Sequence, residues 1–313
     1  MRRLAVKSIF LSITLFAYLL YYSPSVVKEL WAYSFSRLWF YLFRFRVRVI
    51  QHNLVRVFPR QKEESNRQFR VRIQALCKEN LKHMAMFFWE FIEVFAWKKS
   101  DFENNISVVG AQPLLNSLEK KEGFFLLVAH HGNWELSAKM GAQLNLKVSI
   151  VVKYVRNAFL DELLSESRER FKLILMREKG SGRGIVKSIK KGQSVAFMND
   201  QHTGLPNGIP SQFLGIKSWN QKNLPLLAQR LEAPIFPGNL IRVSTKKFRM
   251  SFEEPIRIDP VLDLNSEESL NCEIQRVNRP IEKWVEDFPE QYLWMHRRFK
   301  DTFSYDSQLP WEL

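Results

Sequence analysis

The stretch that decides the fold class of this chain is FFLLVAHHGNWELSAKM, residues 124–140. Its first residues form a short, continuous apolar run, which is typical of a strand buried in a parallel sheet. A Gly-Asn turn follows, and Asn133 suits the N-cap of a helix that begins at Trp134. A buried strand that turns directly into a helix is the repeating unit of α/β folds.

The same alternation continues towards the C-terminus. Further apolar runs are predicted as strands, and they cover 147–152, 194–198 and 234–240. Helical patterns separate or follow these runs, at 135–144, 160–171, 184–190, 223–231 and 270–288. This order predicts an α/β fold with a mainly parallel central sheet flanked by helices.

Apolar residues also recur at helical spacing before this domain, over 61–98. Glu90 and Glu93 interrupt the apolar face of that helix. We expect both carboxylates to be solvated helix residues.

An apolar segment near the N-terminus predicts a membrane helix. Residues 9–22 are nearly all apolar, and the uncharged stretch 8–27 has about the length that spans a bilayer. A second, aromatic segment at 31–43 predicts an interfacial helix. The expected organisation is therefore membrane-anchoring and interfacial helices over 1–60 and an α/β domain over 61–313. The alternative is a pair of buried helices in a soluble domain.

The charge of the chain indicates an acidic partner. Its formal net charge is +15 at pH 7, and within 1–60 ten Lys and Arg face a single acid, Glu29. These charges are interleaved with apolar and aromatic residues, as at a membrane interface, rather than gathered on a nucleic-acid-binding module. We expect membrane lipids as partners and no nucleic acid, with Arg44, Arg46 and Arg48 at lipid headgroups.

His130 and Glu135 form the candidate catalytic pair. His130 follows the first predicted strand, at the end where α/β folds place their sites. Across the strand–turn–helix corner, Glu135 can approach the imidazole, fix its tautomer and stabilise the imidazolium. Without a serine or cysteine beside it, His130 could deprotonate an acceptor hydroxyl directly. Backbone N–H groups around Gly132 and Asn133 could bind an oxyanion.

Two other interpretations of these residues remain open at this point. A histidine at a strand end is often structural. A metal site would combine His130, His131 and Glu135, but the chain lacks the i, i+4 histidine pair of a zinc helix. We therefore expect no metal and no cofactor.

Four blocks resemble, in the same order, the lipid A biosynthesis lauroyl- and myristoyltransferase-like branch of the lysophospholipid acyltransferase superfamily. The first is HNLVRVFP at 52–59, and the second is the H-x4-E spacing of HHGNWE at 130–135. The third is SIKKGQSVAFMNDQHTGLPNGIPSQFLG at 188–215, and the fourth is FPEQYLWMHRRFK at 288–300. Gln212, His202 and the proline-free KYVRN depart from the family pattern, and these departures concern the acceptor.

The resemblance implies an O-acyltransferase of the bacterial inner membrane whose catalytic domain faces the cytoplasm. It implies an acyl thioester donor, on acyl carrier protein or as acyl-CoA, and a glycolipid acceptor such as a lipid A precursor. A mannosylated inositol lipid or another membrane lipid is the alternative acceptor. By carry-over, His130 is the general base and Glu135 its partner. Asp200 and Gln201 match the pair beside the acceptor, and Arg156 matches a residue that could hold its phosphate.

Two basic clusters could guide an acidic acyl carrier protein to the site. They are Arg168, Arg170 and Lys172, and Lys187, Lys190 and Lys191. A glycosyl- or phosphotransferase is disfavoured, because the chain has no G-x-x-x-x-G-K-[ST] loop and no convincing Asp-x-Asp pair. The remaining rival is a non-enzymatic, basic membrane-binding protein.

Overall fold

The computed structural model describes residues 2–312, except 144–146, 153–156 and 178–179. The chain packs into two units, each described by itself below. The first unit comprises Met1–Ser25, Phe88–Met198 and Leu227–Pro260. The second comprises Val26–Phe87, Asn199–Leu226 and Val261–Leu313.

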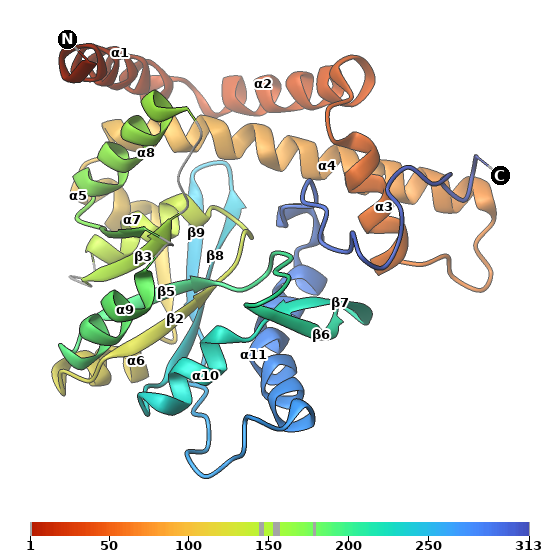
Figure 1. Cartoon of the computed structure of the whole chain (residues 1–313). Coiled ribbons are helices and arrows are strands. Elements are labelled where there is room, and N and C mark those ends of the chain that lie inside the picture. Colours follow the sequence, from red (N-terminus) through yellow and green to blue (C-terminus); the bar gives the residue numbers. More distant parts are fainter. Residues whose placement is uncertain (1, 144–146, 153–156, 178–179, 313) are drawn as a thin grey trace. The chain divides into compact units, whose positions relative to one another are not determined.

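A seven-stranded sheet forms the centre of the first unit (Figure 1). Its order is β1-β9-β8-β2-β5-β3-β4, and every pair is parallel except the antiparallel β8 and β9. The strands are β1 (Ile106–Val109), β2 (Phe124–Val128), β3 (Val148–Val152), β4 (Ile174–Arg177), β5 (Ser194–Met198), β8 (Ile235–Ser244) and β9 (Lys247–Phe252). The predicted α/β fold with a mainly parallel central sheet is confirmed.

Helices flank both faces of this sheet. Alternate residues of a strand point to opposite faces. Val148 of β3 belongs to the apolar core together with Leu136 and Met140 of α7. The next residue, Ser149, instead places its hydroxyl 3.4 Å from that of Ser188 on α9.

The helices of the first unit are α1 (Arg2–Tyr22), α5 (Lys99–Asn105), α6 (Gln112–Glu119), α7 (Trp134–Gln143), α8 (Ala158–Arg170) and α9 (Ser181–Lys190), with the 3-10 turn η2 (Val94–Ala96). Two further helices, α4 (Asn66–Glu93) and α10 (Asn223–Arg230), each contribute residues to both units.

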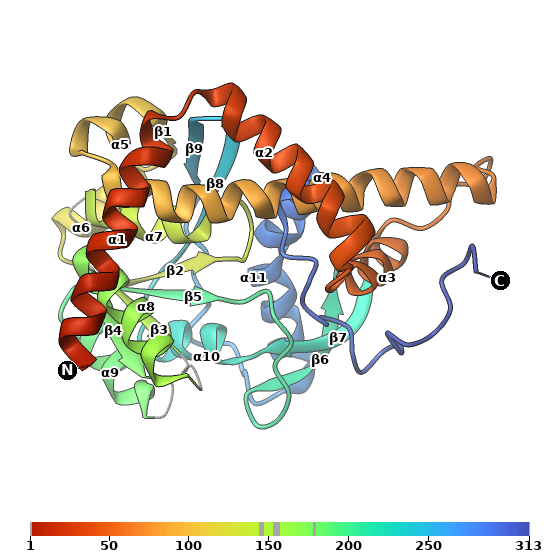
Figure 2. The same cartoon turned by 90° about the horizontal axis from the view of Figure 1, so that it is seen from above.

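The central position of β2 explains its continuous apolar sequence. It lies between β8 and β5, and it runs beside β5 in both views (Figures 1 and 2). Phe124 meets Phe236 edge to face, with ring centroids 5.3 Å apart. Phe125 points to the opposite face and meets Phe197 at 5.5 Å. Apolar side chains are therefore needed at successive positions rather than at alternate ones.

The expected membrane-spanning helix at the N-terminus is not supported. Helix α1 runs from Arg2 to Tyr22, but its uncharged part begins only at Ser8. Pro24 follows the end of the helix, so the apolar stretch stays below the roughly 20 residues that a bilayer requires. Of the helices in the described part of the chain, none combines the length and the apolar character needed to cross a membrane.

The second unit combines helices with a small antiparallel hairpin. Its elements are α2 (Ser25–Leu38), the π-helical η1 (Trp39–Phe43), α3 (Val47–Val57), β6 (Gly208–Phe213), β7 (Ile216–Gln221), α11 (Glu267–Asp287) and η3 (Pro289–Gln291). Asn53 of α3 donates from Nδ2 to the carbonyls of Trp294 and His296, at 2.7 and 2.8 Å. The blocks 52–59 and 288–300, which the family resemblance singled out separately, therefore pack against each other.

Candidate active site

A glycine and a backbone hydrogen bond fix the corner that carries the catalytic candidates. Gly132 has φ +59°, and a Cβ at this position would lie 1.8 Å from the carbonyl oxygen of Leu240 on β8. Glycine alone meets both conditions without strain. The N–H of Asn133 donates to the same carbonyl at 3.0 Å. The turn is thereby held against β8, and His130 stands at the carboxyl end of β2.

Asn133 begins helix α7 as the sequence predicts. Its Oδ1 accepts a hydrogen bond from the N–H of Leu136 at 3.0 Å, which is the N-cap geometry. Its Nδ2 donates to Oε2 of Glu90 at 2.8 Å. Because its N–H bonds to Leu240, this group is not free to bind an oxyanion. Within the first unit, Asn133 holds the corner in place.

Glu90 is a buried anchor of this corner. It is 3% exposed, and it accepts two hydrogen bonds from Arg242. Nε of Arg242 donates to Oε1 of Glu90 at 2.6 Å, and Nη2 of Arg242 donates to Oε2 at 2.8 Å. Glu93 is also buried, at 2% exposed. The prediction that both carboxylates are solvated is therefore wrong, because helical spacing alone does not reveal a buried partner on a distant strand.

The two adjacent histidines have different surroundings. His131 is buried, and its Nδ1 lies 3.1 Å from Oδ1 of Asn239 on β8. His130 is only half-buried, and its ring meets that of Trp134 edge to face at 5.4 Å. A substrate can reach only a side chain that retains some exposure, so His130 is the better placed of the two for proton transfer.

Glu135 lies in the first turn of α7 and forms an ion pair with Arg168 of α8. The distance from the guanidinium nitrogen to Oε1 is 3.0 Å, and the side chain of Glu135 is 14% exposed and that of Arg168 24%. Arg168, which we expected in a surface cluster that guides the donor, thus contacts the candidate catalytic pair. The predicted contact between Glu135 and His130 stays a prediction.

One helical turn after Glu135, Lys139 lies in an aromatic cage. The lysine is 1% exposed, and its Nζ lies 4.8 Å from the ring centroids of Phe91, Phe95 and Phe171. Within the described part of the chain, this Nζ has no hydrogen-bond partner. The attraction between the cation and three ring faces takes the place of hydrogen bonds here.

The buried lysine predicts a pH-dependent stability. Burial lowers the pKa of Lys139 to about 7, the carboxylate of Glu135 opposes this change, and Arg168 adds to it. In the unfolded chain the lysine titrates near pH 10.4, so between about pH 7 and 10 the unfolded state binds more protons than the folded state. The free energy of unfolding should therefore rise by about 2 kcal/mol from pH 7 to pH 9.

Urea unfolding followed by tryptophan fluorescence at several pH values measures this slope. Lys139→Met should remove it, while Lys187→Met, at an exposed position of α9, should retain it. Parallel pH profiles for the wild type and Lys139→Met would contradict the assignment.

The remaining predicted site residues are placed as follows. Arg156 falls in 153–156, outside the described residues. Asp200 and Gln201 belong to the second unit, where Asp200 is buried and Gln201 half-buried. The backbone carbonyl of Asp200 accepts a hydrogen bond from the hydroxyl of Tyr292 at 3.1 Å. Burial lowers the pKa of Arg298, whereas Tyr292 and Asp200 raise it, so the Asp200 carboxylate contributes to the electrostatics of this interior.

The sequence did not assign a site role to three residues around this turn. Lys139 could have been noticed, because it stands at i+4 from Glu135, where side chains on one helix face meet. Glu90 was noticed but assigned to solvent. Arg242 carries no local signal, since only the folding of β8 brings it to Glu90.

Comparison with known proteins now identifies the family. The sequence model for the bacterial lipid A biosynthesis acyltransferases matches residues 2–301. The chain is 23% identical over 256 residues to the lipid A biosynthesis lauroyltransferase of Escherichia coli (strain K12), covering 82% of this chain and 79% of that protein. It is 24% identical over 258 residues to the palmitoleoyltransferase of the same organism, with the same coverage. It is 22% identical over 258 residues to a lipid A biosynthesis acyltransferase of Haemophilus influenzae, covering 82% of this chain and 78% of that protein. Since the family match spans nearly the whole chain, this protein belongs to the bacterial lipid A biosynthesis acyltransferase family and is an O-acyltransferase.

Proposed function

We propose that this enzyme transfers a fatty acyl chain from an acyl thioester to a hydroxyl of a lipid A precursor. The observation that carries the proposal is the half-buried His130 at the carboxyl end of β2, with Glu135 in the first turn of α7. Family membership supports the choice of acceptor, since the relatives named above are lipid A lauroyl- and palmitoleoyltransferases.

In this mechanism Nε2 of His130 accepts the proton of the acceptor hydroxyl while the oxygen attacks the thioester carbonyl. The tetrahedral intermediate then collapses, the C–S bond breaks, and His130 returns the proton to the leaving thiolate. Glu135 stabilises the imidazolium that exists between these two transfers. The transfer itself requires no metal and no redox cofactor, since the proton and the acyl group are both accounted for.

The neighbours of Glu135 support its role as a fixed carboxylate. Arg168 holds one oxygen at 3.0 Å, and the buried amino group of Lys139 lies one turn further along the same helix. A carboxylate that is already anchored loses little freedom when it orients a histidine. We propose that Arg168 and Lys139 act on the reaction through Glu135.

Acyl carrier protein is the donor we favour, with acyl-CoA as the alternative. Lys187, Lys190 and Lys191 are all exposed at the C-terminal end of α9. A basic cluster of this kind steers an acidic carrier protein towards the enzyme. Arg168, from the other predicted cluster, is already paired with Glu135. Asp200, Gln201 and Arg156 stay predicted contacts of the acceptor.

We propose that α1 associates with the cytoplasmic side of the inner membrane by lying along its surface. Leu11, Leu15 and Leu19, at successive i+4 positions, are 63–64% exposed, whereas Ala17 and Leu20 are buried. An apolar stripe on one face of a helix suits insertion at the headgroup boundary. This orientation, and the division into an anchoring part over 1–60 and a catalytic part over 61–313, stay predictions.

Mass spectrometry of the product tests the proposed function. The detergent-solubilised protein is incubated with acyl carrier protein thioesters, or with acyl-CoA, and a lipid A precursor that bears Kdo sugars. A mass gain of one acyl chain is the expected result. If a mannosylated inositol lipid is acylated instead, that lipid rather than the lipid A precursor is the acceptor. Failure of every donor to turn over with either acceptor would overturn the proposed donor and acceptor classes.

A further inference from the structure

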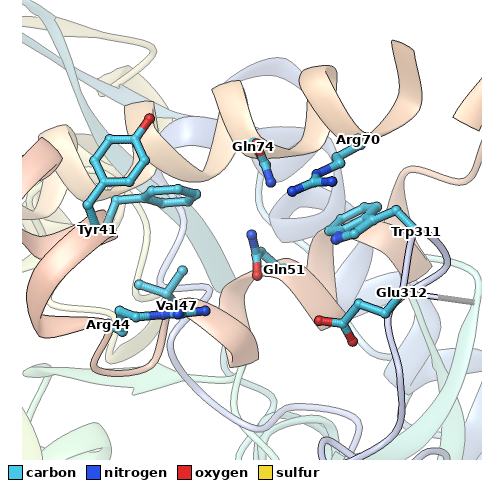
Figure 3. Close-up of a pocket in the computed structure, with 9 residues that line it drawn as sticks. Tyr41, Arg44, Val47, Gln51, Arg70, Gln74, Trp311 and Glu312 are labelled. Carbon is cyan, nitrogen blue, oxygen red and sulfur yellow. The ribbon is translucent and has the colours of Figure 1, made fainter. Parts of the chain in front are cut away.

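A pocket of about 350 Å³ lies within the second unit (Figure 3). Three segments line it: η1 with the start of α3, the first half of α4, and the C-terminal segment. The lining residues are Phe40, Tyr41, Arg44, Val47, Gln51, Arg70, Gln74, Trp311 and Glu312. Nothing in the proposed acyl transfer uses this pocket.

The polar lining favours an anionic ligand. Arg44 and Arg70 lie on opposite sides of the opening, and the side chains of Gln51 and Gln74 lie between them (Figure 3). In the described part of the chain, neither arginine forms an ion pair. Guanidinium groups that lack a carboxylate partner are suited to bind phosphate oxygens, and the two amides can donate further hydrogen bonds.

The one acid in the pocket is already engaged. Glu312 accepts hydrogen bonds from both terminal nitrogens of Arg48, at 3.2 and 3.1 Å. Its Oε2 also accepts the N–H of Leu309 at 2.8 Å. That backbone hydrogen bond is the main reason why the pKa of Glu312 is lowered, and Arg48 adds to it. Arg48 offsets the charge of Glu312, so the charges of Arg44 and Arg70 remain for a ligand.

Large, exposed apolar side chains are neighbours in sequence of Arg44, which lines the pocket. Leu42, Phe43 and Phe45 are 68%, 56% and 64% exposed, and they flank Arg44 in the chain. Arg44 and Arg46 both adopt positive φ, 52° and 60°, a conformation that few non-glycine residues adopt. In this tight turn, the apolar side chain of Phe45 stands between the basic side chains of Arg44 and Arg46 in the chain. Large apolar side chains that alternate with arginines are typical of a membrane interface.

We propose that this pocket binds the headgroup phosphate of an anionic glycerophospholipid. Arg44 and Arg70 supply the positive charge that attracts the headgroup, Gln51 and Gln74 donate to its phosphate oxygens or to the glycerol, and the exposed apolar side chains next to Arg44 enter the acyl boundary. The exposed apolar side chains of Leu42, Phe43 and Phe45 favour a lipid over free phosphate as the source of the anion. Binding to this pocket can be measured without turnover, so failure of this proposal is distinguishable from failure of the proposed acyl transfer.

Vesicle flotation of the full chain tests the proposal. Binding to vesicles of phosphatidylglycerol in phosphatidylcholine is compared with binding to phosphatidylcholine alone, for the wild type and for Arg44→Gln/Arg70→Gln. A basic residue close to an anionic surface strengthens binding about fivefold, so the double variant should lose roughly 10- to 30-fold in affinity for the anionic vesicles. The matched control is Lys62→Gln/Arg67→Gln, which removes the same charge from exposed positions outside the pocket and should lose less than about threefold.

A second measurement separates the lipid from free phosphate. Short-chain phosphatidylglycerol below its micelle concentration should raise the Tm of the wild type and of the control variant, but not that of the pocket variant. Equal losses in vesicle binding for the two double variants would overturn the proposal, because the effect would then be general surface charge. Inorganic phosphate that raises Tm as much as the short-chain lipid would also overturn it, in favour of a free anion.

Discussion

His130→Ala should lower kcat for acyl transfer by a factor of about 10² to 10⁴, which is the usual contribution of a general base. The physical reason is that the acceptor hydroxyl is a weak nucleophile until a base removes its proton. The ring of His130 is half-buried beside Trp134, so its truncation should leave the fold intact. Initial rates with the donor thioester and the lipid acceptor measure the loss, and a thermal melt shows that the variant is folded.

Glu135→Gln serves as the matched variant in the same assay. The amide keeps the shape of the side chain but not the charge that stabilises the imidazolium, so we expect a smaller loss than for His130→Ala. A His130→Ala enzyme that retains more than a tenth of the wild-type rate would overturn the assignment of the base.

The largest effect on stability should come from Glu90→Gln. This change leaves the guanidinium of Arg242 buried, since its side chain is only 8% exposed, and removes its charge partner. Breaking a buried ion pair at one end costs about 3–5 kcal/mol, because the remaining charge is not compensated. The amide would also disturb the hydrogen bond from Asn133, so the corner that holds His130 should lose rigidity.

Glu103→Gln is the matched control for this prediction. Glu103 pairs with Lys99 at 3.5 Å, but both side chains are more than 60% exposed, so the loss should stay below about 1 kcal/mol. Urea unfolding of both variants measures the difference. Equal losses for the two variants would show that the pair formed by Glu90 and Arg242 has no special role in stability.

Local sequence pattern was sufficient for the centre of the fold. The strands β2, β3, β5 and β8 lie where short apolar runs predict them, and helices α7 to α11 follow the predicted helical patterns. The edge strands β1 and β4 and the hairpin strand β9 were missed. Their residues are partly exposed or alternate with charged side chains, so they lack the continuous apolar run of a central strand.

The membrane helix shows where pattern alone misleads. A stretch of uncharged residues predicted a span across the bilayer, but the helix ends at Tyr22 and Pro24 follows. A helix must be both long enough and apolar along that length to cross a bilayer, and no helix of the described residues meets both conditions. The exposed stripe on α1 became visible only when burial was known for each residue.

Local sequence features suffice to specify the turn that positions the catalytic candidates. The apolar run of β2, the glycine at position 132 and the cap at Asn133 are local features, since each depends on residues a few positions apart. The surroundings of this turn depend on long-range packing, which brings Arg168 to Glu135, Arg242 to Glu90, and three phenylalanines around Lys139. These partners come from distant parts of the chain, and the strength of an ion pair or a buried charge depends on burial, which exists only after the sheet has formed.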